Sequence, residues 1–112
     1  MSPRRPPGPT LTVFRWQQIP AFVSARHGDE AIRVALPARF HLAIDRAAMG
    51  GGAAGSDEYS RHWRKDERAC SVDLRAEVDA RVAALDAALS DSDLERLVRE
   101  ARDARRAREE AR

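Results

Sequence analysis

Apolar and polar residues alternate in three short stretches near the start of the chain. In Thr10–Trp16, Phe14 and Trp16 stand two residues apart, so in a strand their side chains share one face as bulky core groups. A second apolar run follows at 21–25, and a third at 31–36 shows the two-residue period most clearly. Each stretch predicts a β-strand.

Turn-forming residues separate these runs. Gln17-Gln18-Ile19-Pro20 interrupts the alternation, and Pro20 lacks the N–H group that a central strand needs. His27-Gly28-Asp29-Glu30 is typical of a hairpin turn. We therefore expect three consecutive antiparallel strands, with Thr10–Trp16 or Ile32–Leu36 at an edge where a partner strand could add.

From Pro37 onward the apolar spacing changes to the period of an α-helix, and Gly50-Gly51-Gly52 ends this first helix. Its apolar stripe consists of Phe40, Ile44, Ala47 and Ala48. A cap at Ser56 or Asp57 predicts a second helix. That helix would carry Tyr59, His62 and Trp63 on one face, and the charged Lys65–Arg68 would follow as a loop.

Two further helices complete the pattern. The third is expected from Asp73, with an apolar seam of Leu74, Val78, Val82, Leu85 and Leu89. The polar Ser90–Asp93 then caps a fourth, which carries Leu94, Leu97, Val98 and Ala101. The predicted fold class is α+β: a three-stranded antiparallel meander packed on one face by three to four helices.

Composition divides the chain into three parts. Residues 1–9 hold four of the six prolines and predict a disordered Pro/Arg-rich head. Residues 10–101 form a single domain, and the charged segment 102–112 is expected to be a helical extension or disordered, because it has no large apolar residue to bury. The net charge of +2, the single cysteine and the absence of a long apolar segment favour a cytoplasmic protein without a membrane anchor.

The candidates for chemistry are few. His41 and Asp45 stand four residues apart on one helical face, where a carboxylate could orient an imidazole as a general base. A surface ion pair explains the same spacing, and Cys70 has no local nucleophile signature. The glycine-rich loop after the first helix precedes Asp57-Glu58, which would repel a phosphate. We expect no cofactor, no metal and no enzymatic activity.

A basic ridge is the main alternative. On a helix, Arg61, Lys65 and Arg68 would form one basic ridge beside Trp63, and nucleic-acid-binding proteins combine basic residues with aromatic platforms. Arg64 and the arginine-rich tail after Ala101 would add to such a binding surface. Interleaved acidic residues dilute this ridge, and the balanced charge argues against nucleic acid as the main partner. A small nucleic-acid-associated basic protein remains the alternative to a protein-binding domain.

Several strings together resemble the small bacterial virulence factor domain family, a module also found in conserved virulence factor C. They are Trp16, Ile19-Pro20, Leu36-Pro37-Ala38-Arg39-Phe40, Ile44-Asp45-Arg46-Ala47-Ala48-Met49, Gly55-Ser56-Asp57-Glu58-Tyr59 and Trp63-Arg64. The resemblance spans about Val13 to Leu85 and includes no catalytic motif.

This resemblance implies an accessory domain that binds another protein, with a link to corrinoid and tetrahydrofolate one-carbon metabolism. A thin core and open sheet edges favour the same interpretation. The expected interaction surface consists of Arg39, His41, Asp45, Arg61, Arg64 and Lys65. The partner and the oligomeric state are not predicted.

Overall fold

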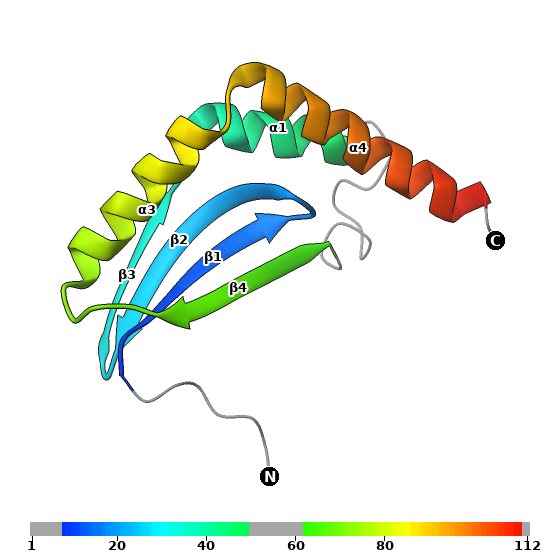
Figure 1. The fold of residues 1–112 in the computed structure, drawn as a ribbon. Coiled ribbons are helices and arrows are strands. Elements are labelled where there is room, and N and C mark those ends of the chain that lie inside the picture. Colours follow the sequence, from blue (N-terminus) through cyan, green and yellow to red (C-terminus); the bar gives the residue numbers. More distant parts are fainter. Residues whose placement is uncertain (1–7, 50–61, 111–112) are drawn as a thin grey trace, which may run out of the picture.

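The computed structural model describes residues 8–49 and 62–110 of the chain. The elements are β1 (Thr10–Trp16), β2 (Ile19–His27), β3 (Glu30–Ala35), α1 (Ala38–Met49), β4 (Trp63–Ala69), α3 (Leu74–Ala88) and α4 (Asp91–Glu110). The helices arch over one side of a curved sheet, with α3 along the strands and α1 beside α4 at one end (Figure 1). The expected α+β fold, an antiparallel meander covered by helices, is confirmed.

The sheet has one strand more than the sequence pattern indicates. Its order is β3-β2-β1-β4, and all neighbouring strands are antiparallel. The strand β4 pairs with β1 from Trp16 opposite Trp63 to Thr10 opposite Ala69. The predicted helix through Trp63 and the loop over 65–68 are therefore wrong. Residues 50–61, which include the glycine-rich loop and the predicted cap, lie outside the described residues.

Pairing on both sides makes β1 an interior strand, whereas β3 and β4 are the edges of the described sheet. Backbone pairing with β1 stabilises β4, although most of its side chains are exposed and have no apolar period. Charged side chains on an exposed edge strand discourage sheets from joining edge to edge. Of the two predicted edges, only the β3 side is one.

Pro20 lies inside the central strand β2 rather than before it. The pairing of β1 with β2 is irregular between Phe14 and Arg15, so that Phe14 faces Phe22 while Arg15 faces Pro20. Such a bulge accommodates a residue that cannot donate to the ladder. The connecting turn uses Gln17 at a φ of 55°, in the left-handed region.

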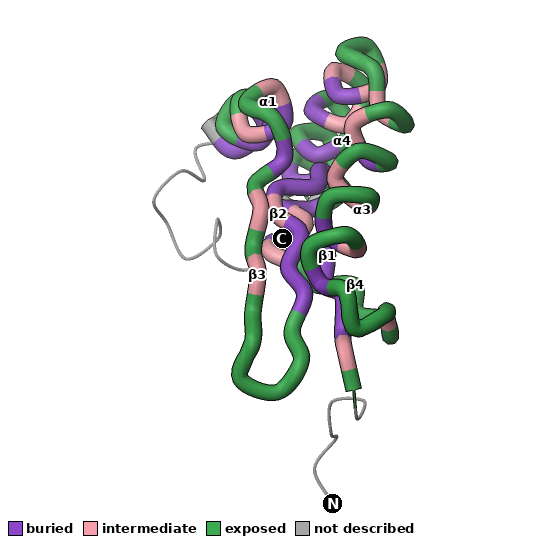
Figure 2. The backbone as a smooth tube through the Cα atoms, turned by 90° about the vertical axis from the view of Figure 1, so that its left-hand side faces the viewer, coloured by how far each residue is buried: buried purple, intermediate pink, exposed green. Residues whose placement is uncertain are grey.

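The core lies between the sheet and the helices. The predicted stripe of α1 and the apolar seams of α3 and α4 supply buried residues to it, which confirms the helical assignments (Figure 2). Trp16 is 0% exposed, as expected of a core group. Phe14 is only partly buried, so the prediction that it shares the core with Trp16 is wrong.

Candidate functional site

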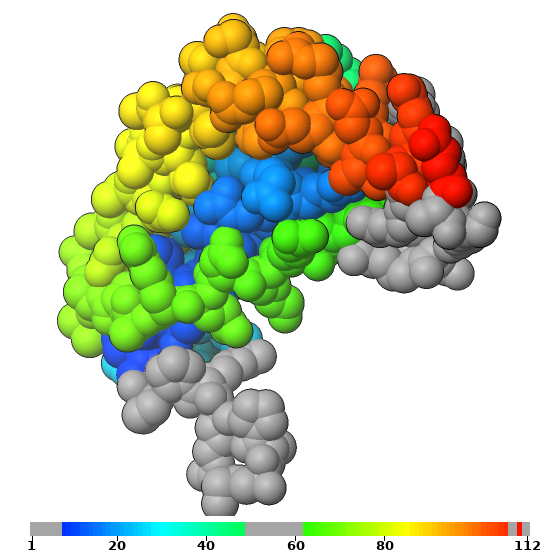
Figure 3. All heavy atoms as spheres, turned by 45° about the vertical axis from the view of Figure 1, so that its right-hand side comes forward, coloured from blue at the N-terminus to red at the C-terminus, as the bar shows by residue number. Residues whose placement is uncertain are grey.

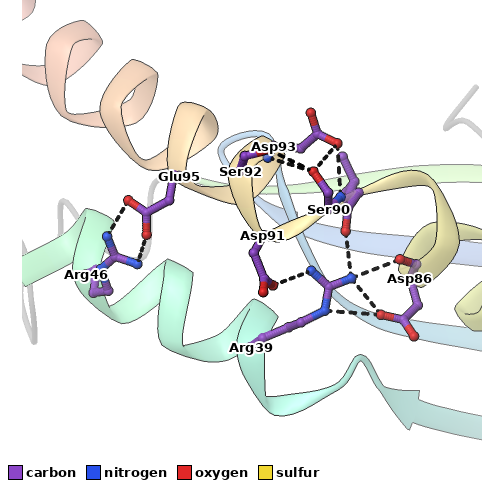
Figure 4. Close-up of polar contacts among 9 residues, drawn as sticks. Arg39, Arg46, Asp86, Ser90, Asp91, Ser92, Asp93 and Glu95 are labelled. Carbon is purple, nitrogen blue, oxygen red and sulfur yellow. Dashed lines mark hydrogen bonds and ion pairs between the residues drawn. The ribbon is translucent and has the colours of Figure 1, made fainter.

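Arg39, an expected surface residue, instead joins three segments of the chain (Figure 4). Its Nη2 donates to Asp86 Oδ1 at 2.7 Å and to the Leu89 carbonyl at 2.6 Å, while Nη1 donates to Asp91 Oδ1 at 3.1 Å. The hydrogen bond to Asp86 raises the pKa of Arg39 above its already high value. These contacts fasten the start of α1 to the junction of α3 and α4, so Arg39 has a structural role.

Arginines of α4 hold the other end of α1. Arg105 is 2% exposed, and its Nη1 donates to the carbonyls of Ala47 at 2.8 Å and Ala48 at 3.2 Å. Arg102 donates to the carbonyl of Arg46 at 3.0 Å. Cations at a helix C-terminus satisfy its unpaired carbonyls and oppose its dipole. The segment after Ala101 is helical to Glu110, and its residues Arg102 and Arg105 donate hydrogen bonds to carbonyls of α1.

His41 and Asp45 do not form the expected pair. His41 packs edge-on against the ring of Phe22, with centroids 5.2 Å apart, and its Nε2 is buried without an acceptor or donor. Asp45 is exposed, and no hydrogen bond joins it to His41. Arg15 and Arg33 of the sheet contact Asp66 and Phe22 and not Asp45. The geometry does not bring a base and its orienting carboxylate together.

Cys70 has the wrong environment for a nucleophile. Burial raises the pKa of its thiol, and the neighbouring Glu77 raises it further, against a smaller opposite effect of Arg68. The thiol is therefore protonated at neutral pH, and only the thiolate is strongly nucleophilic.

The basic ridge is divided between the two faces of a strand. Arg64, Lys65 and Arg68 are exposed on β4, and the alternation of a strand places Lys65 on one face and Arg64 and Arg68 on the other. Arg61 lies outside the described residues. Lys65 and Trp63 line the same hollow on the surface of the sheet, whereas Arg64 does not line it.

The hollow beside Lys65 and Trp63 has a volume of about 270 Å³. It is lined by Phe14, Phe22, Arg33, Trp63 and Lys65, which we call the aromatic hollow. Arg81 of α3 lies beside Leu11 and Val13, so α3 covers the face of β1 to which these two residues point. Phe14 follows Val13 and points the other way. The aromatic hollow therefore lies on the sheet face opposite α3.

The floor of the aromatic hollow is a set of rings in contact. Phe14 and Phe22 are direct cross-strand partners, and the centroids of Phe22 and Trp63 are 6.3 Å apart. The guanidinium of Arg33 lies 4.1 Å from the centroid of Phe22 and 5.5 Å from that of Phe14. Cation–π contacts of this kind hold an arginine over the rings while it retains its charge. The hollow combines an apolar floor with two cations.

Sequence reasoning included Lys65 in its surface but missed Phe14, Phe22 and Arg33. Phe14 and Arg33 were assigned to strands, yet only the strand register shows that they and Phe22 meet. The available signal was Arg33, a charged residue between the apolar Ile32 and Val34, because period two places it opposite the core.

Within residues 8–49 and 62–110, no group of histidine, cysteine, aspartate or glutamate side chains is arranged to hold a metal ion. None of the helices in the same residues is long and apolar enough to span a bilayer.

The fold is a small α+β domain with one helix-covered sheet face and the aromatic hollow on the other. The family model described as virulence factor matches residues 14–98. This chain belongs to that family. Searches of curated proteins and of solved structures find no match.

Proposed function

We propose that this domain is a non-catalytic accessory module that binds a protein partner through the aromatic hollow. The observation that carries the proposal is the position of three aromatic rings and two cations on the sheet face opposite α3. Aromatic residues and arginine are enriched at the centres of protein interfaces, where they contribute most of the binding energy.

The residues that line the aromatic hollow support a partner of complementary chemistry. A volume of about 270 Å³ suits one or two side chains of a partner better than an enclosed small molecule. The rings favour an apolar or aromatic side chain, and Arg33 and Lys65 favour carboxylates beside it. The partner is thus an acidic segment with at least one large apolar residue.

The proposal of a non-enzymatic role rests on the surroundings of the reactive groups. His41 faces a ring, Asp45 faces solvent, and the thiol of Cys70 has a raised pKa. The family resemblance adds a direction for the search. Enzymes of corrinoid- and tetrahydrofolate-dependent one-carbon metabolism are the first partners to test.

Nucleic acid is the second candidate, because bases stack on exposed rings of a β-sheet beside cations. Arg102 and Arg105, part of the basic tail behind this idea, donate to carbonyls of α1 instead. Such binding would be strongly salt-dependent, with a slope that reflects the number of phosphates neutralised.

Two neighbouring residues provide a matched test. Lys65→Glu reverses a charge in the aromatic hollow, whereas Arg64→Glu makes the same change on the opposite face of the same strand. Tagged protein is first used to capture a partner, which is then purified and titrated with each variant. We expect Lys65→Glu to weaken binding by about tenfold or more and Arg64→Glu to change it little.

Trp63 gives a second readout, because a partner in the aromatic hollow should shift its fluorescence while the buried Trp16 stays unchanged. Equal losses for both variants, or a stable monomer without any stoichiometric partner, would contradict the proposal. Salt-sensitive binding of single-stranded RNA or DNA that Lys65→Glu weakens would assign the same hollow to nucleic acid.

A further inference from the structure

A second, smaller hollow lies between α3 and β4. It measures about 60 Å³ and is lined by Leu11, Val13, Asp66, Glu67, Arg68 and Arg81. Its floor is apolar, because Leu11 and Val13 are nearly fully buried residues of β1. Figure 3 shows blue atoms of β1 between the yellow atoms of α3 and the green atoms of β4. The hollow is thus a charged cleft over a core surface.

Arg81 is the unusual residue of this cleft. Its side chain is partly buried, and its Nε is buried without a hydrogen-bond acceptor. Burial lowers the pKa of Arg81, and the nearby Arg68 and Arg15 lower it further, while Asp66 opposes them. A buried guanidinium N–H without an acceptor lowers the stability of the fold more than a neutral unsatisfied donor does, because the group is charged.

The carboxylates near Arg81 either accept hydrogen bonds from other groups or start on the other face of β4. Asp66 accepts from Arg15 Nε, with a distance of 2.8 Å between Oδ2 and Nε. Glu77 accepts from the backbone N–H of Ser71 at 2.6 Å, next to Arg68. Glu67 also lines the cleft. It alternates along β4 with Asp66 and Arg68, so its side chain leaves the strand on the opposite face. Neither Asp66 nor Glu67 forms an ion pair with Arg81.

We propose that this cleft binds an oxyanion, a carboxylate or a phosphate group, with Arg81 as the principal donor and Arg68 as the second. A volume of about 60 Å³ corresponds to roughly two water molecules and suits one such group. The apolar floor strengthens the interaction, because charges attract more strongly where water is excluded. Arginine presents several N–H groups in a fork that matches the oxygens of either anion.

This site is independent of the aromatic hollow. Leu11 and Val13 point to the helix-covered face of the sheet, whereas Phe14 points to the opposite face. A ligand in the cleft would contact α3 and β4 together. It would therefore join the edge strand to the helix layer, in addition to the backbone pairing of β4 with β1.

The direct test follows the Nε–Hε resonance of Arg81 in the wild-type full chain. Inorganic phosphate and acetate are titrated separately at constant ionic strength, with chloride as the reference anion. We expect a saturable shift of the Arg81 signal and slower exchange of its Hε. A response to phosphate alone would identify a phosphate site, and a response to acetate alone a carboxylate site.

Two substitutions on α3 give the matched comparison. Arg81→Met keeps the length of the side chain without its charge and should weaken anion binding by about tenfold, the factor expected for one charge-assisted hydrogen bond. Arg75→Met removes an exposed arginine that pairs with Asp79 on the same helix and should leave binding unchanged. If Arg81→Met does not fold, the wild-type titration decides alone. Absence of a saturable Arg81 shift, or equal weakening by Arg75→Met, would overturn the proposal.

Discussion

Several arginines of this chain point at backbone carbonyls near helix ends. Arg39 donates to the carbonyls of Asp86 and Leu89, where α3 ends, and Arg105 does the same for the last carbonyls of α1. Carbonyls in the last turn of a helix have no partner within it. Guanidinium groups fit this task, because their N–H groups can serve several acceptors at once. Arginine side chains therefore connect α1 to the junction of α3 and α4 and to the second half of α4.

Arg39→Met should destabilise the fold by about 1–2 kcal/mol. The substitution keeps the apolar stem but removes every hydrogen bond to Asp86, Leu89 and Asp91, and partial exposure of Arg39 reduces the cost through solvent screening. Urea denaturation at pH 7 measures the change. Arg46→Met removes an exposed ion pair with Glu95 and should have a smaller effect. Equal effects of the two substitutions would contradict a structural role for Arg39.

At the level of elements, the start of α4 has a well-formed helix cap. Ser90 and Asp93 form a reciprocal capping box: Ser90 Oγ accepts from the Asp93 N–H at 3.1 Å, and Asp93 Oδ2 accepts from the Ser90 N–H at 2.9 Å. The backbone N–H of Ser90, and then its hydroxyl, lower the pKa of Asp93. The cap therefore stabilises the fold most when Asp93 is ionised.

This pKa shift predicts how α4 responds to acid. Because the pKa of Asp93 is lower in the folded state, its contribution is complete above the ordinary value of about 4 and is lost as the pH falls through the folded pKa. Glu77 should add to the same loss, because the Ser71 N–H lowers its pKa. Ser90→Ala removes the hydroxyl but keeps the backbone N–H, so it should raise the carboxyl pKa of Asp93 only part of the way toward 4, as measured by carbon NMR. An unchanged pKa in this variant would show that the hydroxyl of Ser90 does not contribute to the shift.

Elements differ in how well the sequence specifies them. The strands β1 and β3 and the helices α1, α3 and α4 were predicted because each buries one face and leaves the periodic trace of that burial. The strand β4 was missed because an edge strand with mostly exposed charged side chains has no such period. Pro20 was placed outside its strand because the bulge that tolerates it depends on pairing with β1.

The candidate site was harder to predict than the fold for a related reason. Lys65 was found as part of a basic run next to Trp63, yet the other three residues of the aromatic hollow come from β1, β2 and β3. Arg39 was expected at the surface, because its acceptors, Asp86, Leu89 and Asp91, are about fifty residues further along the chain. Local periodicity contains no information on such distant contacts, and strand register supplies it.

On the scale of the whole molecule, α4 connects parts that are distant in sequence. It packs mainly against α1, whereas α3 packs against β2 and β3 (Figure 1). The end of α1 is thus held by the charged half of α4, beyond the last large apolar residue, Val98. The sequence places the domain boundary at 101, but Arg102 and Arg105 contribute to the fold after it.

Deleting residues 102–112 tests this arrangement directly. The truncated chain should keep the sheet and α3, because their apolar contacts lie before the deletion. It should lose protection in the last turn of α1, whose carbonyls no longer meet Arg102 and Arg105. Amide hydrogen exchange, compared between the two chains, should show faster exchange in α1 and α4 and little change in β1 and β2.

The point variant Arg105→Met separates the arginine from the length of the helix. It leaves α4 intact but removes the donor of two carbonyls of α1. We expect the free energy of unfolding to fall by about 2–3 kcal/mol. Replacing Arg106, which is exposed on the same helix, should have little effect. If Arg106→Met lowers the free energy of unfolding as much as Arg105→Met, general charge rather than carbonyl capping stabilises the end of α1. If only Arg105→Met does so, the folded domain extends past residue 101 to the arginine that closes α1.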